Sequence, residues 1–165
     1  RLPVEFDVVV REKSFPYFAG CRNVRLHSAI SEDELIDLYR QADALLLPLV
    51  DATANNAVLE SIACGTPVIS TAVGGIPDYV NQAAGWLFPK GEVNGVVELI
   101  QAGCTNREIF ESRRAGARCK SLEFDWKEVR KQLYSVYGSV CKGLPVDLSN
   151  LASSRTLTKL EFKDA

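Results

Sequence analysis

The chain has 165 residues, of which 47% are hydrophobic and 24% charged, and its formal net charge is −2. This length and composition predict one globular domain with its own core and exclude a fibrous or disordered chain. The small net charge argues against the clustered basic surface of a nucleic-acid-binding protein, and no apolar run approaches the roughly 18 residues that span a bilayer.

Cysteine usage indicates the redox setting of the chain. The five cysteines are scattered and show no C-x-x-C spacing. This pattern favours free thiols in a reducing cytoplasm over a disulfide framework or a zinc site. The first residues, RLPVEFDVVV, lack a secretory pattern. Because the sequence contains no methionine, not even an initiating one, we expect it to be a piece of a longer protein.

Predicted strands and helices alternate along the first half of the chain. Apolar runs predict strands over residues 4–10, 23–27, 43–49, 66–71 and 85–88. A capping box, with Ser31 as N-cap and Glu34 three residues later, starts a helix that ends near Gln41, and a second helix covers residues 55–64. Apolar strands that alternate with helices predict an α/β fold, a Rossmann-like doubly wound parallel sheet with helices on both faces.

The last third of the chain is predicted to be helical. The helices are expected at about residues 92–102, 106–121 and 126–141. Residues 143–165 lose this periodicity. We therefore divide the chain into one domain, residues 1–142, and a tail or appendage, residues 143–165.

Two loops of small residues follow successive predicted strands and form the candidate ligand site. In an open parallel sheet, ligands bind beyond the carboxyl ends of the strands, where helix N-termini favour phosphate. The loop DATANN contains Thr53 and leads into the second helix, and Glu60 lies one turn and a half into that helix. A carboxylate there can accept hydrogen bonds from a ribose diol. Gly74 and Gly75 repeat the arrangement one strand later, and glycine lets a ligand approach the backbone closely.

Structural roles explain the same residues equally simply. Asn55 suits the N-cap of a helix, an isolated glutamate on a helix is usually solvated, and Gly74 and Gly75 can form an ordinary turn. A binding role predicts that bulk at Gly75 weakens ligand binding more than stability, whereas a structural role predicts the reverse. The spacing alone leaves both interpretations open.

The stretch LIDLYRQADALLLPLVDATANNAVLESIACGTPVISTAVGGIPDYV closely resembles the donor-binding, C-terminal half of GT-B glycosyltransferases. The resemblance is to the large retaining group called glycosyltransferase family 4, or glycosyl transferases group 1, and it runs from about residue 20 to 142. Its motifs occur in order: Leu-Tyr-x-x-Ala-Asp, Leu-Glu-x-x-Ala-x-Gly-x-Pro-Val and Gly-Gly-x-Pro. FDWKEVRKQLYSVY is similar to the last helix of the family, which packs across the domain junction, so we expect this helix to expose apolar surface here.

The resemblance implies a role for each matching position. Glu60 matches the second glutamate of the family's E-x7-E motif, which holds the donor ribose. The loop whose amides reach the donor sugar and diphosphate matches Asn55, Asn56 and Ala57, with the neighbouring Thr53. The segment that lines the nucleobase matches Ser28 to Ile30. The glycine loop beside the donor matches Gly74 and Gly75, and all of these are candidate donor-binding residues.

Two features depart from the family pattern, and the roles of three nearby residues are interpreted from the sequence alone. The first motif glutamate falls at Ala52, so sugar positioning must rely on other groups, and no catalytic residue is assigned. The family holds the diphosphate with an Arg and a Lys on an earlier segment that has no match in this sequence. Arg11 and Lys13 can supply positive charge or be ordinary surface residues, and His27 is interpreted as structural.

The resemblance implies transfer of a sugar, of the hexosyltransferase type, from a nucleoside diphosphate sugar to an acceptor hydroxyl with retention. It implies no metal and no cofactor, because GT-B folds stabilise the leaving diphosphate with amides, a helix dipole and basic side chains. The expected partners are the nucleotide sugar and an N-terminal acceptor-binding domain, with peripheral membrane association of the full-length enzyme left open. The fragment alone is expected to be inactive. The alternative is a non-catalytic nucleotide-sugar-binding or assembly module, and donor base, sugar and acceptor stay open.

Overall fold

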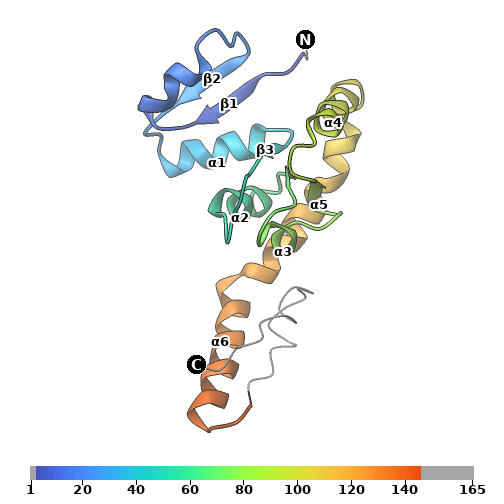
Figure 1. Ribbon diagram of the computed structural model, residues 1–165. Helices are drawn as coiled ribbons and strands as arrows, with labels where there is room; N and C mark the ends of the chain where they lie inside the picture. Colours follow the sequence, from blue (N-terminus) through green and yellow to red (C-terminus); the bar gives the residue numbers. More distant parts are fainter. Residues whose placement is uncertain (1–2, 146–165) are drawn as a thin grey trace.

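The structure, a computed structural model, describes residues 3–145 (Figure 1). Strands and helices alternate over the first part, in the order β1 (Phe6–Val9), the 3-10 helix η1 (Glu12–Phe18), β2 (Val24–His27), α1 (Glu32–Gln41), β3 (Leu45–Leu47), α2 (Asn56–Ala63), β4 (Val68–Thr71), α3 (Ile76–Tyr79) and β5 (Gly85–Phe88). Helices form the rest, namely α4 (Val93–Thr105), α5 (Glu108–Ser121), the 3-10 helix η2 (Leu122–Phe124) and α6 (Trp126–Cys141). Of the predicted tail, residues 146–165 lie outside the described residues.

All strand pairs are parallel, which confirms the predicted α/β class with parallel sheets. β1 pairs with β2, Phe6 lying opposite Val24. β4 lies between β3 and β5, with Val68 opposite both Leu45 and Gly85. Among the described residues, hydrogen bonding divides the five strands into two sheets, β1–β2 and β3–β4–β5.

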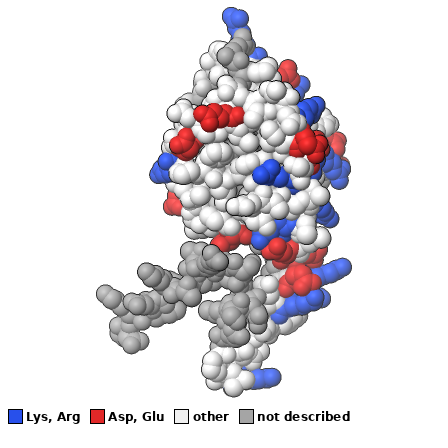
Figure 2. Space-filling model, turned by 90° about the vertical axis from the view of Figure 1, so that its right-hand side faces the viewer, with Lys and Arg blue, Asp and Glu red and all other residues white. Residues whose placement is uncertain are grey.

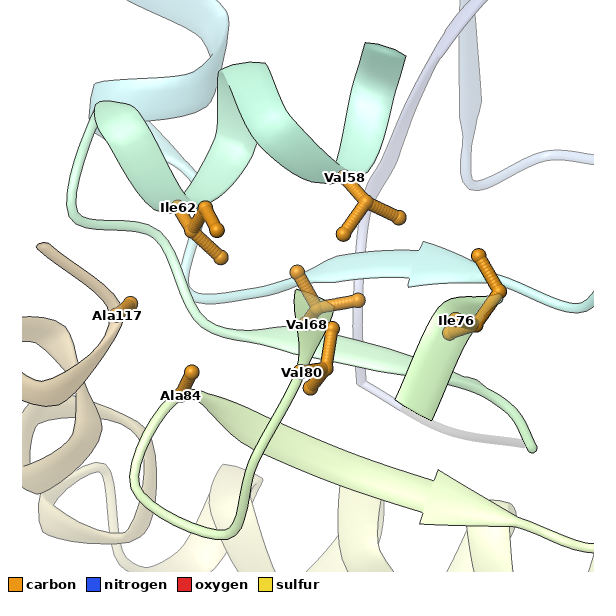
Figure 3. Close-up of a cluster of buried hydrophobic side chains, with 7 residues drawn as sticks. All are labelled: Val58, Ile62, Val68, Ile76, Val80, Ala84 and Ala117. Atoms are coloured by element: carbon orange, nitrogen blue, oxygen red, sulfur yellow. The ribbon is translucent and has the colours of Figure 1, made fainter. Parts of the chain in front are cut away.

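The core lies between α2, β4 and the segments that follow β4. All four residues of β4 are buried, which explains why this strand shows no alternation of polar and apolar residues. Figure 3 shows Val58 and Ile62 of α2 directed toward the sheet. The cluster consists of Val58, Ile62, Val68, Ile76, Val80, Ala84 and Ala117. Each fully buried Val or Ile contributes about 1.5–3 kcal/mol, so this cluster fixes the position of α2 on the sheet.

Two arginines of α5 bind the ends of α1 and α2. Arg114 Nη2 donates to the carbonyl oxygen of Ala42, at the end of α1, over 2.6 Å. Arg118 Nη1 donates to the carbonyl oxygen of Ala63, at the end of α2, over 2.9 Å. Carbonyls at a helix C-terminus lack partners and carry partial negative charge, so a guanidinium suits both positions. α5 therefore holds α1 and α2 side by side.

α6 extends away from the rest of the molecule and is supported at its base by η2 (Figure 1). None of its residues is buried, and Trp126 is 79% exposed. Its apolar residues recur every three or four positions, at Trp126, Val129, Leu133, Val136 and Val140. Figure 2 shows basic side chains along the same part of the molecule. The expected exposure of apolar surface by this helix is confirmed.

Candidate functional site

The loops that follow β3 and β4 lie against each other, and the predicted glycines are at the contact. A Cβ atom on Gly75 would come within 3.0 Å of the carbonyl oxygen of Thr53, and one on Gly74 within 3.0 Å of the carbonyl oxygen of Ala52. Gly74 also has a φ of +51°, which glycine adopts without strain. The structure thus brings Thr53, Gly74 and Gly75 together and gives the glycines a structural role as well.

Asn55 is the N-cap of α2, as its residue type suggested. Its Oδ1 accepts a hydrogen bond from the amide of Val58 over 3.3 Å. The amides of Asn56 and Ala57 belong to the first turn, where a helix offers no internal acceptor. Because the positive end of the helix dipole lies at the same place, these two amides are suited to an anionic group.

Glu60 faces α1 rather than the loops. Its Oε2 accepts a hydrogen bond from Tyr39 Oη of α1, over 3.1 Å. Both side chains line a groove of about 620 Å³ between α1 and α2, together with Glu32, Cys64 and Arg118. Burial raises the pKa of Tyr39, and the charge and hydrogen bond of Glu60 raise it further. The phenol therefore stays protonated at neutral pH and acts as a donor to Glu60.

The segment from Ser28 to Ile30 connects β2 to α1. Ala29 has a φ of +52°, a conformation that costs roughly 1–2 kcal/mol for a residue with a Cβ atom. Ile30 precedes the N-cap Ser31, whose capping box with Glu34 fixes where α1 begins. Glu32, in the first turn of α1, lines the groove. Ser28, Ala29 and Ile30 are not among the residues that line it, so the structure does not bring the predicted nucleobase segment and Glu60 together in this groove.

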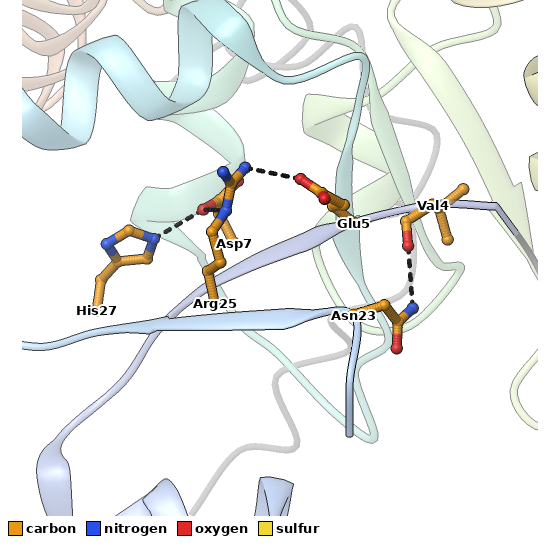
Figure 4. Close-up of polar contacts among 6 residues, drawn as sticks. All are labelled: Val4, Glu5, Asp7, Asn23, Arg25 and His27. Carbon is orange, nitrogen blue, oxygen red and sulfur yellow. Dashed lines mark hydrogen bonds and ion pairs between the residues drawn. The ribbon is translucent and has the colours of Figure 1, made fainter. Parts of the chain in front are cut away.

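A polar cluster covers one face of the β1–β2 pair (Figure 4). His27 Nε2 lies 2.8 Å from Asp7 Oδ1, and Arg25 donates to the two oxygens of Asp7 over 3.0 Å each. Arg25 also lies 3.3 Å from Glu5. Burial raises the pKa of Asp7, but the hydrogen bonds from His27 and Arg25 and their charges lower it overall. These contacts give His27 a structural partner, in agreement with its sequence interpretation.

Arg11 and Lys13 are exposed at the start of η1, just after β1. This placement fits ordinary surface charges, and a role toward a ligand stays a prediction. Sequence reasoning did not single out Tyr39, because its only local signal was membership of the apolar face of α1. Its contact with Glu60 joins residues 21 positions apart and depends on the packing of α1 against α2.

Within residues 3–145, no three His, Cys, Asp or Glu side chains are grouped so that they could hold a metal ion. All five cysteines fall in this range and are free thiols. No helix in the described part is long and apolar enough to cross a bilayer.

The fold and the site define a parallel α/β domain in which a capped helix N-terminus and a glycine loop follow the carboxyl ends of β3 and β4, and in which the carboxylate of Glu60 faces α1. The chain belongs to the family described as Glycosyl transferases group 1, whose sequence pattern matches residues 7–106. This confirms the family-level resemblance found in the sequence.

Two relatives illustrate the match. The chain is 31% identical over 121 residues to D-inositol 3-phosphate glycosyltransferase 1 of Catenulispora acidiphila, which covers 73% of this chain and 29% of the relative. It is 31% identical over 111 residues to sulfoquinovosyl transferase SQD2 of Arabidopsis thaliana, which covers 62% of this chain and 22% of the relative. The chain therefore spans less than a third of the length of these relatives.

Solved structures share the fold. Sucrose-phosphate synthase from Thermosynechococcus elongatus superimposes with a TM-score of 0.66 at 23% identity, over 79% of this chain and 33% of that one. Anabaena HepE, solved in complex with UDP, gives a TM-score of 0.64 at 19% identity, over 82% of this chain and 41% of that one. The fold is that of GT-B glycosyltransferases.

Proposed function

We propose that this chain is the donor-binding domain of a retaining glycosyltransferase of family 4, which moves a hexosyl group from a nucleoside diphosphate sugar to an acceptor hydroxyl. The observation that supports this most directly is that the exposed carboxylate of Glu60 lines a groove between α1 and α2. The ligand class is suggested by relatives in fold, because HepE was solved with UDP and the pneumococcal O-GlcNAc transferase GtfA with UDP and GlcNAc.

Each part of the site has a task in this proposal. Glu60 accepts hydrogen bonds from the ribose hydroxyls, and the base lies against Ser28 to Ile30. The amides of Asn56 and Ala57, at the positive end of the α2 dipole, face the diphosphate. Gly74 and Gly75 keep the loop after β4 close to the loop after β3, so that both lie beside the donor. The donor binds without a metal or a cofactor.

The acceptor in this proposal comes from another domain of a longer, cytoplasmic protein. α6 offers the surface on which that domain packs, since its apolar face is exposed in the described residues. Transfer requires both domains, because holding two reactants in register can account for about 7–11 kcal/mol of the barrier. The 165-residue chain is therefore proposed to bind nucleotide and not to transfer sugar.

A non-catalytic module is the second candidate, and Ala52 favours it. The first glutamate of the family motif is replaced there by a methyl side chain, and the carbonyl of Ala52 is already bonded to the amide of Gly75. The two candidates differ in turnover. The longer protein, incubated with radiolabelled nucleotide sugars and pooled acceptors, yields a labelled product if it is an enzyme and none if it is a binding module.

Calorimetric titration of the 165-residue chain with UDP tests the binding proposal. Glu60→Gln keeps the shape of the side chain but removes its charge, and loss of a charge-assisted hydrogen bond worth about 1.5–3 kcal/mol weakens binding roughly 10- to 150-fold. Glu98→Gln, on the exposed surface of α4, is the matched control and leaves the affinity unchanged. Equal affinities for the Glu60→Gln variant and the wild type would refute the assignment of Glu60 to the ribose.

A further inference from the structure

The carboxylate of Glu60 is held from one side only. Tyr39 Oη donates to Oε2 over 3.1 Å, and no other described side chain bonds to either carboxylate oxygen. Tyr39 itself is only 9% exposed, whereas Glu60 is exposed. An almost buried phenol thus binds an exposed carboxylate of the groove from one side and leaves its other side open to solvent.

Tyr39 is anchored through its backbone as well. Thr66 Oγ1 donates to the carbonyl oxygen of Tyr39, and Ser61 Oγ donates to the carbonyl oxygen of Thr66 over 2.9 Å. Thr66 and Ser61 are fully buried, so these bonds are shielded from water. They connect the end of α1 to the turn between α2 and β4. The phenol therefore projects from a backbone position that is fixed relative to the helix that carries Glu60.

We propose that Tyr39 is a positioning residue for the nucleotide ribose: its hydroxyl holds Oε2 of Glu60, which orients the carboxylate and leaves Oε1 to accept the ribose hydroxyls. This inference rests on the role proposed above for Glu60. A free glutamate side chain must lose rotamer freedom when it binds a ligand, and a residue that restricts it in advance reduces that cost.

The protonation state of Tyr39 suits this task. Burial raises its pKa, and the adjacent Glu60 raises it further, since a phenolate beside a carboxylate would be repelled. The hydroxyl is therefore a donor to Glu60 over the whole physiological pH range.

Tyr39→Phe removes the hydroxyl and keeps the ring, so it separates orientation from packing. The test compares the affinities of UDP and of 2′,3′-dideoxy-UDP, which lacks both ribose hydroxyls. We expect the wild type to bind UDP roughly 10-fold or more tightly than the dideoxy analogue, and Tyr39→Phe to weaken UDP about 2- to 10-fold while leaving the analogue unchanged. A purely structural role weakens both ligands equally, and that result would overturn the proposal. Tyr134→Phe, on the exposed face of α6, is the matched control.

Two further variants distinguish failure of this inference from failure of the proposed function. If Glu60→Gln lowers the preference for UDP but Tyr39→Phe does not, Glu60 binds the ribose and the inference about Tyr39 is wrong. If Glu60→Gln leaves the preference unchanged, or UDP does not bind the wild type, the proposed function is wrong and the inference is wrong with it. The preference for UDP over the dideoxy analogue should fall no further in the double variant, Tyr39→Phe with Glu60→Gln, than in Glu60→Gln alone, because Tyr39 acts through Glu60. An additional loss in the double variant would contradict the inference.

Discussion

The amide of Gly75 donates a hydrogen bond to the carbonyl oxygen of Ala52 over 3.0 Å, and this bond joins the loop after β4 to the loop after β3. The two loops are in backbone contact, since a Cβ atom on Gly75 would meet the carbonyl oxygen of Thr53. The expectation that bulk at Gly75 spares stability therefore does not fit the structure. Close approach is needed here between two protein segments, whether or not a ligand also approaches.

Gly75→Ala should lower the free energy of unfolding by about 1–3 kcal/mol, because the added methyl group forces the two loops apart. Gly75 has a φ of −82°, which alanine adopts freely, so the loss reports the contact and not backbone strain. Urea unfolding followed by circular dichroism measures it. Gly138→Ala is the control, because a Cβ atom there meets nothing within 4 Å and alanine favours the helix. Equal stability of the Gly75→Ala variant and the wild type would show that the loops can separate without cost.

Acid should weaken the β1–β2 pair through Asp7. The hydrogen bonds and charges of His27 and Arg25 outweigh burial and hold the pKa of Asp7 below its usual value of 3.8. A carboxyl group whose pKa is lower in the folded state contributes stability that is present above its unfolded pKa and is lost as the pH falls through the folded pKa. Asp7→Asn should therefore be less stable than the wild type at pH 6, and this difference should shrink below about pH 4.

The measurement is a pair of urea unfolding curves for each protein, at pH 6 and pH 3. Asp37→Asn is the control, since Asp37 is exposed and lies 4.0 Å from Arg40. A difference between the Asp7→Asn variant and the wild type that is the same at both pH values would exclude titration of Asp7 as the cause.

Local signals predicted most of the elements. The capping box of Ser31 and Glu34 depends on residues three positions apart, and the structure confirms both of its hydrogen bonds. The parallel pairing of the strands also followed from apolar runs that alternate with helices. α3, with only four residues and Pro77 in its first turn, was not predicted, because so short a helix has no periodicity to detect. The division into two sheets was not predictable either, since strand pairing is not a local property.

The site was predicted less completely than the fold. Asn55 was recognised as a helix cap from its residue type, and Glu60 and the glycines were located from their spacing and their resemblance to a family. Tyr39 was missed because its partner lies 21 residues away, and Arg114 and Arg118 were missed because they bind backbone carbonyls of distant helices. Such contacts depend on tertiary packing, and a single sequence contains no periodic signal for them.

The apolar face of α6 should make the 165-residue chain self-associate. Trp126, Val129, Leu133, Val136 and Val140 follow the three- and four-residue spacing that places side chains in one seam of a paired helix. Of these, Trp126 is 79% exposed, Leu133 42% and Val140 60%. Apolar surface of this kind is removed from water when a second copy packs on it, and each buried large side chain contributes about 1.5–3 kcal/mol.

Sedimentation velocity over a concentration series should show oligomers that increase with protein concentration. Leu133→Lys places a charge in the middle of the seam, and we expect it to weaken association roughly 10-fold or more, which is the loss of one buried leucine. Val93→Lys, at an exposed site on α4, is the matched control and should associate like the wild type. A wild-type chain that is monomeric at all concentrations would contradict the prediction. Association that persists in the Leu133→Lys variant but is lost in the Val93→Lys variant would place the interface on α4.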